Sequence, residues 1–137
     1  MRAIQIRDKT SDGRVLAFDL REALAALGTQ ALRTYWAVSG VADQGEALSA
    51  TGDGGVELEE LARSGARVSG ARLLQIAQRV RQVIWGEFNS YDSSEAAEPR
   101  LVIRAIDSSC FEVRCDDETI LARIPGAFAD VRPAPKS

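Results

Sequence analysis

Residues 101–115 read LVIRAIDSSCFEVRC, and this stretch decides the fold class. It holds two runs, 101–106 and 110–115, in which the β-branched and aromatic residues typical of strands recur. Only Asp107-Ser108-Ser109 separates the two runs, and so short a connection joins antiparallel neighbours. A similar run at 83–88 precedes them. The three runs together predict an antiparallel meander.

Further strands are predicted nearer the N-terminus. Apolar runs at 3–6 and 15–18 flank a turn-prone segment at 9–13, which predicts a short hairpin. Aromatic and β-branched residues at 33–41 predict another strand. The polar, glycine-rich segment at 40–55 shows little periodicity, and we expect it to be the mobile part of the fold.

Apolar residues at helical spacing predict four helices, with capping residues at their ends. They are expected at 20–27 after Asp19, at 56–62 before Ser64-Gly65, at 71–81 after Ser69, and from Asp116 or Asp117 to Arg123. Pro125 is expected to end the last helix, because proline inside a helix costs about 3 kcal/mol.

The apolar stripe of the 71–81 helix indicates where the core lies. We expect Trp85 to be at least mostly buried, together with Val83, against the Leu73, Ala77 and Val80 side of that stripe. The stripe consists of Leu73, Leu74, Ala77 and Val80.

The element order predicts an α+β fold, with an antiparallel sheet of about four to six strands and helices packed mainly on one face. A chain of 137 residues suits one domain, which we assign to 1–131. Phe128 and Val131 are expected to fold back as an apolar tether. Residues 132–137 are expected to form a frayed C-terminal tail.

Charge and hydropathy exclude several classes of partner. The net charge of −3 disfavours nucleic acid, because neutralising phosphates needs a surplus of basic residues. No stretch approaches the roughly 18 apolar residues of a membrane span, so no membrane partner is expected. Asp8, Lys9 and Asp12 interrupt any signal-peptide core, which predicts a cytoplasmic protein.

The chain lacks the residues that most enzymes and metal sites use. It contains no histidine, and no glycine-rich phosphate loop is present. Cys110 and Cys115 fall on opposite faces of one predicted strand, so we expect buried, reduced thiols that bind no zinc. We therefore predict no catalytic residue, no cofactor and no metal.

A carboxylate-based enzyme is the weaker alternative. Glu87, Glu112 and Asp107 lie on or beside adjacent predicted strands and could serve in acid-base chemistry. An ion pair between Glu87 and Arg104 or Arg114 across the sheet is the simpler interpretation.

Charge is arranged in blocks along the chain. Six carboxylates and no basic residue lie between Asp43 and Glu60, five arginines and no carboxylate between Arg63 and Arg81, and four carboxylates without a basic residue between Glu87 and Glu98. The basic block could simply neutralise the acidic ones within the molecule. The functional alternative is an acidic docking surface that steers a basic partner.

Seven residues of the two acidic segments are the candidate partner-binding site. Tyr91 and Asn89 are included because an aromatic flanked by Asn, Ser and Asp is typical of a protein-binding loop, although Tyr91 could equally be an exposed hinge residue. The seven are Asp43, Glu46, Glu87, Asn89, Tyr91, Asp92 and Glu95.

Three segments carry a resemblance to a known group of proteins. Residues 82–88, residues 99–113 and the helix start at Asp116-Asp117-Glu118 resemble small bacterial proteins of the polymorphic-toxin immunity type. The resemblance covers about half the chain and includes no catalytic motif. It implies a protein partner, a toxin domain whose active site would be covered or plugged.

Three function classes follow from these features. The favoured class is a binding protein that neutralises or shields a partner through its acidic loops. The second is an adaptor, chaperone or structural module of a bacterial assembly. The third is an enzyme that uses carboxylates and arginine.

Overall fold

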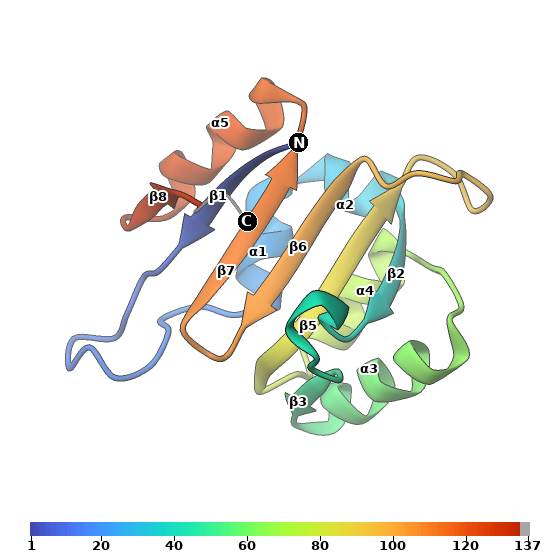
Figure 1. Ribbon diagram of the computed structural model, residues 1–137, viewed down its shortest axis with the longest axis horizontal. Helices are drawn as coiled ribbons and strands as arrows, with labels where there is room; N and C mark the ends of the chain where they lie inside the picture. The colour runs from blue at the N-terminus through green and yellow to red at the C-terminus, as the bar shows by residue number, and fades with distance from the viewer. Residues whose placement is uncertain (135–137) are drawn as a thin grey trace.

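The structure is a computed structural model that describes residues 1–134 (Figure 1). Within these residues eight strands form one antiparallel sheet in the order β4-β2-β5-β6-β7-β1-β8, and β3 pairs with β5 beside this path. The strands are β1 (Arg2–Ile6), β2 (Tyr35–Ser39), β3 (Ser49–Thr51), β4 (Val68–Ser69), β5 (Gln82–Tyr91), β6 (Leu101–Ile106), β7 (Cys110–Cys115) and β8 (Val131–Pro133).

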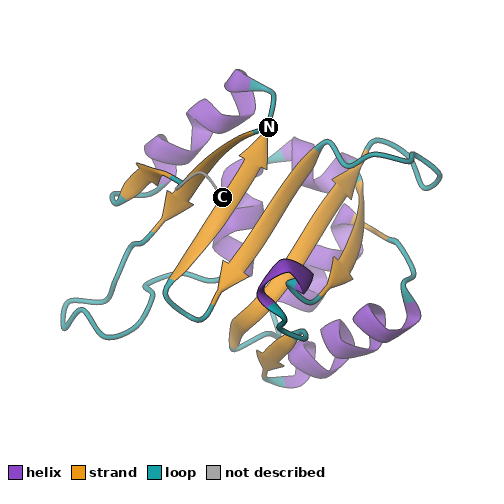
Figure 2. Ribbon diagram, in the orientation of Figure 1, coloured by secondary structure: helices purple, strands orange, loops and turns teal. Residues whose placement is uncertain are grey.

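Helices cover one face of this sheet. In Figures 1 and 2, α1, α2 and α4 lie behind the strands, while α3 and α5 lie beside its two ends. The helices are α1 (Leu20–Leu27), α2 (Thr29–Arg33), α3 (Asp53–Ser64), α4 (Gly70–Ala77) and α5 (Glu118–Ala127). A short 3-10 turn, η1 (Ala42–Gln44), lies in front of β5, on the opposite face. The predicted α+β class is confirmed.

Strand register separates an apolar face from a charged one. Phe88, Ile103 and Val113 stand side by side on β5, β6 and β7, and all three are buried under the helices. Their chain neighbours Glu87 and Arg104 also stand side by side but point to the other face, because side chains alternate along a strand. This second row runs through Ser39, Glu87, Arg104, Glu112, Gln5 and Arg132.

Local sequence signals predict the meander and several helix ends correctly. β5, β6 and β7 are consecutive antiparallel neighbours, as expected. Asp19 caps α1 in a capping box with Glu22, and the helix stops at Gly28, whose φ is +62°. Ser69 caps α4 through a hydrogen bond from the Arg72 backbone N–H. These ends are encoded within a few residues of each helix.

The predicted strand count is too low because three strands are very short. β3, β4 and β8 contain two or three residues, too few to show a periodic pattern. β8 also corrects the predicted tail, since Arg132 and Pro133 pair with β1 and the Ala134 N–H donates to Ala3 O at 3.0 Å. Residues 135–137 of that tail lie outside the described residues.

The predicted N-terminal hairpin is wrong in its second strand. Lys9 and Leu16 form only an isolated bridge, and β1 pairs with β7 and β8 instead. Within the run at 15–18, Val15 and Ala17 are exposed and Phe18 is the buried residue: its ring centre lies 5.1 Å from that of Phe111 and 4.9 Å from that of Phe128. Phe128 thus packs back onto the core, as predicted.

Helix boundaries differ from the prediction in several places. Helix α2 was not predicted, α3 begins three residues earlier than expected, and α4 ends at Ala77 rather than at 81. Helix α5 continues past Pro125 to Ala127. Pro125 removes one backbone donor, but the Phe128 N–H still donates to Ile124 O at 3.1 Å, so the last turn closes.

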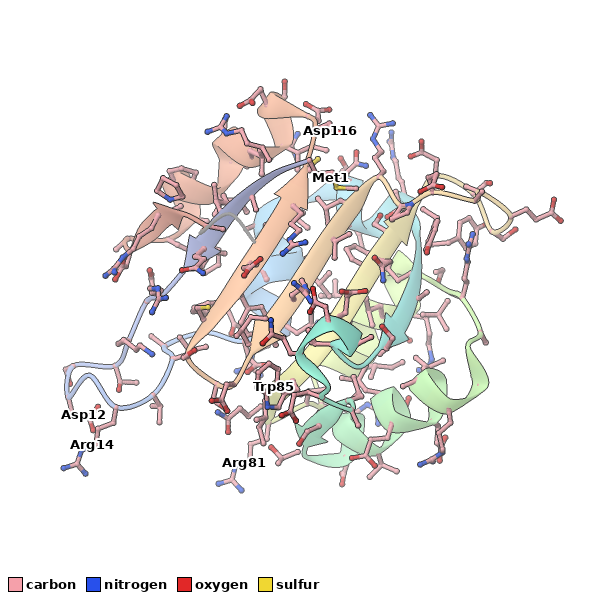
Figure 3. The ribbon with its side chains drawn as sticks, viewed as in Figure 1. Met1, Asp12, Arg14, Arg81, Trp85 and Asp116 are labelled. Atoms are coloured by element: carbon pink, nitrogen blue, oxygen red, sulfur yellow. The ribbon has the colours of Figure 1, made fainter. Side chains whose placement is uncertain are left out.

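A bulge in β5 overturns the predicted core position of Trp85. The pairing of β3 with β5 skips Ile84, so Val83 and Trp85 fall on different faces. Val83 is buried, whereas Trp85, which lies near the start of β5 and is labelled in Figure 3, is only partly buried. Trp36 is the fully buried tryptophan, and its indole N–H donates to Ala31 O at 2.9 Å.

The two acidic segments are folded to a greater extent than their sequence indicates. The segment at 40–55, expected to be mobile, contains η1, β3 and the first turn of α3. Asn89 and Tyr91, expected in a loop, belong to β5, which extends to Tyr91 and pairs with β2.

Candidate functional site

A pocket of about 390 Å³ lies between η1 and the charged face of the sheet. It contains Asp43, Glu46 and Glu87, three of the seven residues predicted to bind a partner. We call it the Arg104 pocket. Its full lining is Ser39, Gly40, Ala42, Asp43, Glu46, Glu87 and Arg104.

The chain at 40–47 forms a closed loop that fixes one wall of the pocket. The backbones of Val41 and Glu46 exchange two hydrogen bonds, of 2.8 and 3.1 Å, and the Val41 side chain is completely buried. Gly40 lies so close to this loop that a Cβ atom there would overlap the Glu46 carbonyl oxygen and Ala47. The position of Asp43 is therefore set by the protein itself.

Arg104 forms the floor of the pocket. Among residues 1–134 it is the only charged residue that is buried, with a side chain 4% exposed. Its guanidinium forms an ion pair with Asp43 through Nη2, and its Nε lies 3.1 Å from Glu87 Oε1. Burying a cation is costly unless it is paired, and these two carboxylates supply the compensation.

The Nε atom of Arg104 is incompletely satisfied. It lies at ion-pair distance from Glu87, but the N–H direction misses the carboxylate oxygen and makes no hydrogen bond in the described part of the chain. A buried donor without an acceptor costs about 1–3 kcal/mol. The Glu87 carboxylate also accepts a hydrogen bond from Asn89 Nδ2 at 3.1 Å. Glu87 is thus shared between Arg104 and Asn89.

The other three predicted residues lie at the far end of β5. The Arg67 guanidinium carbon lies 3.5 Å above the centre of the Tyr91 ring, and its Nη1 donates to the carbonyl oxygens of Ser93 (3.2 Å) and Ser94 (3.0 Å). We call this arrangement the Arg67 clamp. The Tyr91 ring is therefore partly covered by a cation rather than fully exposed to solvent.

Asp92 and Glu95 extend from this clamp into solvent. Asp92 forms an ion pair with Arg100 at 3.1 Å, and Glu95 is exposed. The seven predicted residues therefore form two groups. Asp43, Glu46, Glu87 and Asn89 gather at the Arg104 pocket, and Tyr91, Asp92 and Glu95 gather at the Arg67 clamp.

Part of the blocked charge is neutralised within the molecule. Glu57 on α3 pairs with both Arg72 and Arg79 of the basic block. No ion pair involves Glu46 or Glu95 in the described part of the chain. Internal compensation thus accounts for only some of the carboxylates, and those two remain available to a partner.

The carboxylates of the enzyme alternative do not form one cluster. Glu87 and Glu112 flank Arg104 on β5 and β7, two strands and roughly 10 Å apart. Glu112 pairs with Arg114 at 3.1 Å, and exposed Asp107 lies in the turn between β6 and β7. Of the two predicted partners of Glu87, Arg104 is the observed one.

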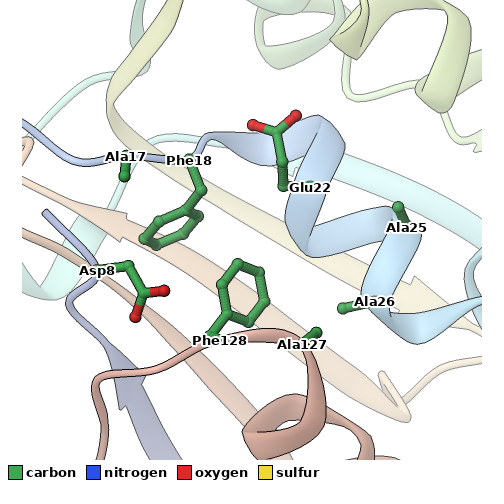
Figure 4. A pocket seen from close by; sticks show the side chains of 8 residues that line it. All are labelled: Asp8, Ala17, Phe18, Glu22, Ala25, Ala26, Ala127 and Phe128. Carbon is green, nitrogen blue, oxygen red and sulfur yellow. The ribbon is translucent and has the colours of Figure 1, made fainter. Parts of the chain in front are cut away.

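A second pocket, of about 450 Å³, lies between α1 and the end of α5 (Figure 4). Both of its carboxylates already accept hydrogen bonds from backbone N–H groups of the protein. Asp8 accepts hydrogen bonds from the backbone N–H groups of Ala129 (3.0 Å) and Asp130 (2.6 Å), and Glu22 completes the cap of α1. The rest of its lining is alanine and phenylalanine, so it offers no free polar group to orient a ligand.

Neither cysteine contributes to the Arg104 pocket. Cys110 and Cys115 are buried and free at the two ends of β7, and burial raises the pKa of each thiol. In residues 1–134 no three His, Cys, Asp or Glu side chains gather in a way that could hold a metal ion. None of the helices in that range is long and apolar enough to cross a bilayer.

Two residues of the site, Arg104 and Arg67, are not among the seven that were predicted from the sequence. Arg104 had a visible signal, because it is the single charged residue in the apolar run LVIRAI. Arg67 had none, since its partner Tyr91 lies 24 positions away along the chain. No protein-family model, curated protein or solved structure matches the chain.

Proposed function

We propose that this protein binds and shields a basic partner protein, in the manner of an immunity protein that neutralises a toxin domain. The observation that carries the proposal is the Arg104 pocket, which Asp43, Glu46 and Glu87 line together with one buried guanidinium. Such an excess of negative charge in a concave site attracts a cationic surface and speeds its association. We propose that the protein binds its partner in the cytoplasm.

Preorganisation supports the proposal. The 40–47 loop is closed by its own backbone hydrogen bonds, and the Arg67 clamp holds the start of the 92–99 loop through Ser93 and Ser94. A partner would therefore spend little free energy on ordering these loops. The exposed carboxylates Glu46 and Glu95 would make the first electrostatic contacts with the partner.

The test begins with the partner. Cross-linking in the source cells, or purification with the product of the neighbouring gene, identifies the protein that is bound, and an activity assay shows whether binding inhibits it. We expect a basic partner whose activity is lost on binding. A partner that keeps its activity in the complex would contradict shielding and favour the adaptor or chaperone alternative.

Kinetics on charge variants then locate the interface. The double variant Glu46→Lys/Glu95→Lys should lower the association rate at least tenfold at low salt, with a smaller loss at 0.5 M salt, where the Debye length falls below about 5 Å. The control variant Glu59→Lys/Glu60→Lys makes the same charge change on α3. If both variants lower the association rate equally, the rate depends only on the net charge of the protein, and a binding site at the pocket is contradicted.

A further inference from the structure

We propose that the Arg104 pocket receives one cationic side chain of the partner, an arginine, and that this residue is the anchor of the complex. The inference rests on the proposed function and deepens it by naming the chemistry of the contact. It follows from which acceptors in the pocket are free, from the formal charge of the lining, and from the incomplete bonding of Arg104.

The free acceptors lie around the mouth of the pocket. Asp43 uses Oδ1 for Arg104, which leaves Oδ2 without a partner in the described residues, and its side chain is 59% exposed. Glu46 is exposed and has no ion partner there, so both of its oxygens are free. A guanidinium carries five N–H donors in a planar fork, and such a fork can bridge two carboxylates at once.

Charge favours a cation over a neutral or acidic group. The lining holds three carboxylates, Asp43, Glu46 and Glu87, against the single guanidinium of Arg104. A second guanidinium would bring the lining close to balance. An acidic group would meet three like charges and would be rejected.

Arg104 supplies an observation that is independent of the acidic cluster. Its Nε is buried at the floor of the pocket without a hydrogen bond, while the neighbouring Glu87 carboxylate accepts a hydrogen bond from Asn89. A guanidinium bound by Asp43 and Glu46 would take up part of the charge of Asp43 and leave Glu87 to Arg104, so that the Glu87 carboxylate could turn onto Nε. The bound state would thus complete a bond that the free protein leaves open.

Nuclear magnetic resonance with a small probe tests the pocket without the partner. Ethylguanidinium, which carries the head group of arginine, should shift the amide signals of residues 40–46 and the Nε–H signal of Arg104, saturating in the millimolar range. N-ethylurea has nearly the same shape and no charge, and it should produce no saturable shift. Equal shifts with both probes, or shifts that do not saturate, would overturn the proposal.

Two matched variants localise the probe. Glu46→Gln should weaken ethylguanidinium binding at least fivefold, whereas Glu60→Gln, which removes the same charge on α3, should leave it unchanged. An equal response of the two variants would also overturn the inference. If the protein binds ethylguanidinium but inhibits no partner, the arginine-binding pocket is supported and the proposed function is contradicted. If a partner is bound through Glu46 and Glu95 but ethylguanidinium does not bind, the proposed function is supported and the arginine-binding pocket is contradicted.

Discussion

Arg104 and Arg67 each hold an acidic segment against the sheet, but they do so in different surroundings. Arg104 is buried beneath the 40–47 loop and pairs with two carboxylates, whereas Arg67 is partly exposed and uses the Tyr91 ring and two carbonyl oxygens. A buried charge depends on its partners, because water cannot replace them. A half-exposed one can exchange them for water at little cost.

The largest effect is expected at the buried arginine. Arg104→Ala should lower the free energy of unfolding by about 3 kcal/mol, because it removes a buried stem and leaves Asp43 and Glu87 without their cation. Denaturant unfolding measures this change. Arg104→Lys, which keeps the charge, should recover part of the loss. A loss below about 1 kcal/mol for Arg104→Ala would mean that burial does not set the difference between the two arginines.

Asp19 extends the comparison, because it is a partly buried carboxylate with no ion partner among residues 1–134. Its carboxylate accepts hydrogen bonds from the backbone N–H groups of Leu20 (2.8 Å) and Val83 (3.2 Å). Burial raises the pKa of this carboxyl from 3.8 to about 6, an effect that these hydrogen bonds oppose. The folded state therefore binds the Asp19 proton more tightly than the unfolded chain does.

This pKa makes a stability prediction with a defined sign. Because the native pKa is raised, the contribution of Asp19 to stability is fully present below pH 4 and is lost as the pH rises through 6, by up to about 3 kcal/mol. Asp19→Asn keeps a capping side chain that does not ionise. Between pH 4 and pH 7 the free energy of unfolding of Asp19→Asn should therefore rise relative to that of the wild type. Parallel pH profiles of the two proteins would refute the raised pKa.

A smaller effect is expected at Arg67. Arg67→Ala should cost about 1 kcal/mol, since it removes a partly exposed cation–π contact and two hydrogen bonds to Ser93 and Ser94. Amide hydrogen exchange should rise in the 92–99 loop and stay unchanged in the 40–47 loop. Faster exchange in both loops would show that the two regions are coupled rather than separate.

The smallest effect is expected at the exposed pair between Arg100 and Asp92. Both side chains are solvated, and an exposed ion pair contributes little. Arg100→Gln should leave the midpoint of thermal unfolding within about 2 °C of the wild type. A larger fall in the midpoint would mean that this exposed pair stabilises the fold as much as a buried interaction does, and that burial does not set the loss of stability.

Local signals predict much of the fold. Asp19, Gly28 and Ser69 mark helix ends through capping geometry, which depends on a few neighbouring residues. The strand-like runs at 101–106 and 110–115, joined by only three residues, predict the meander. By contrast, the bulge at Ile84 places Trp85 on the opposite face from Val83. The sequence of β5 does not predict this bulge, because it occurs where β5 pairs with β3.

The candidate site is predicted less completely than the fold. Charge blocks identify Asp43, Glu46 and Glu87 as unusual, and the isolated charge in LVIRAI identifies Arg104. Their meeting in one pocket depends on the conformation of the 40–47 loop. Gly40 and the paired backbones of Val41 and Glu46 create that conformation.

The sequence by itself determined the α+β class, the central meander, the helix caps and the blocked arrangement of charge. These properties follow from the periods of strand and helix and from composition, which short stretches of chain contain in full. Only the tertiary structure decided that Asp43 meets Arg104, that Arg67 covers Tyr91, and that Val131–Pro133 joins the sheet. Each of these contacts joins distant parts of the chain, so it exists only once register and loop geometry have brought the partners together.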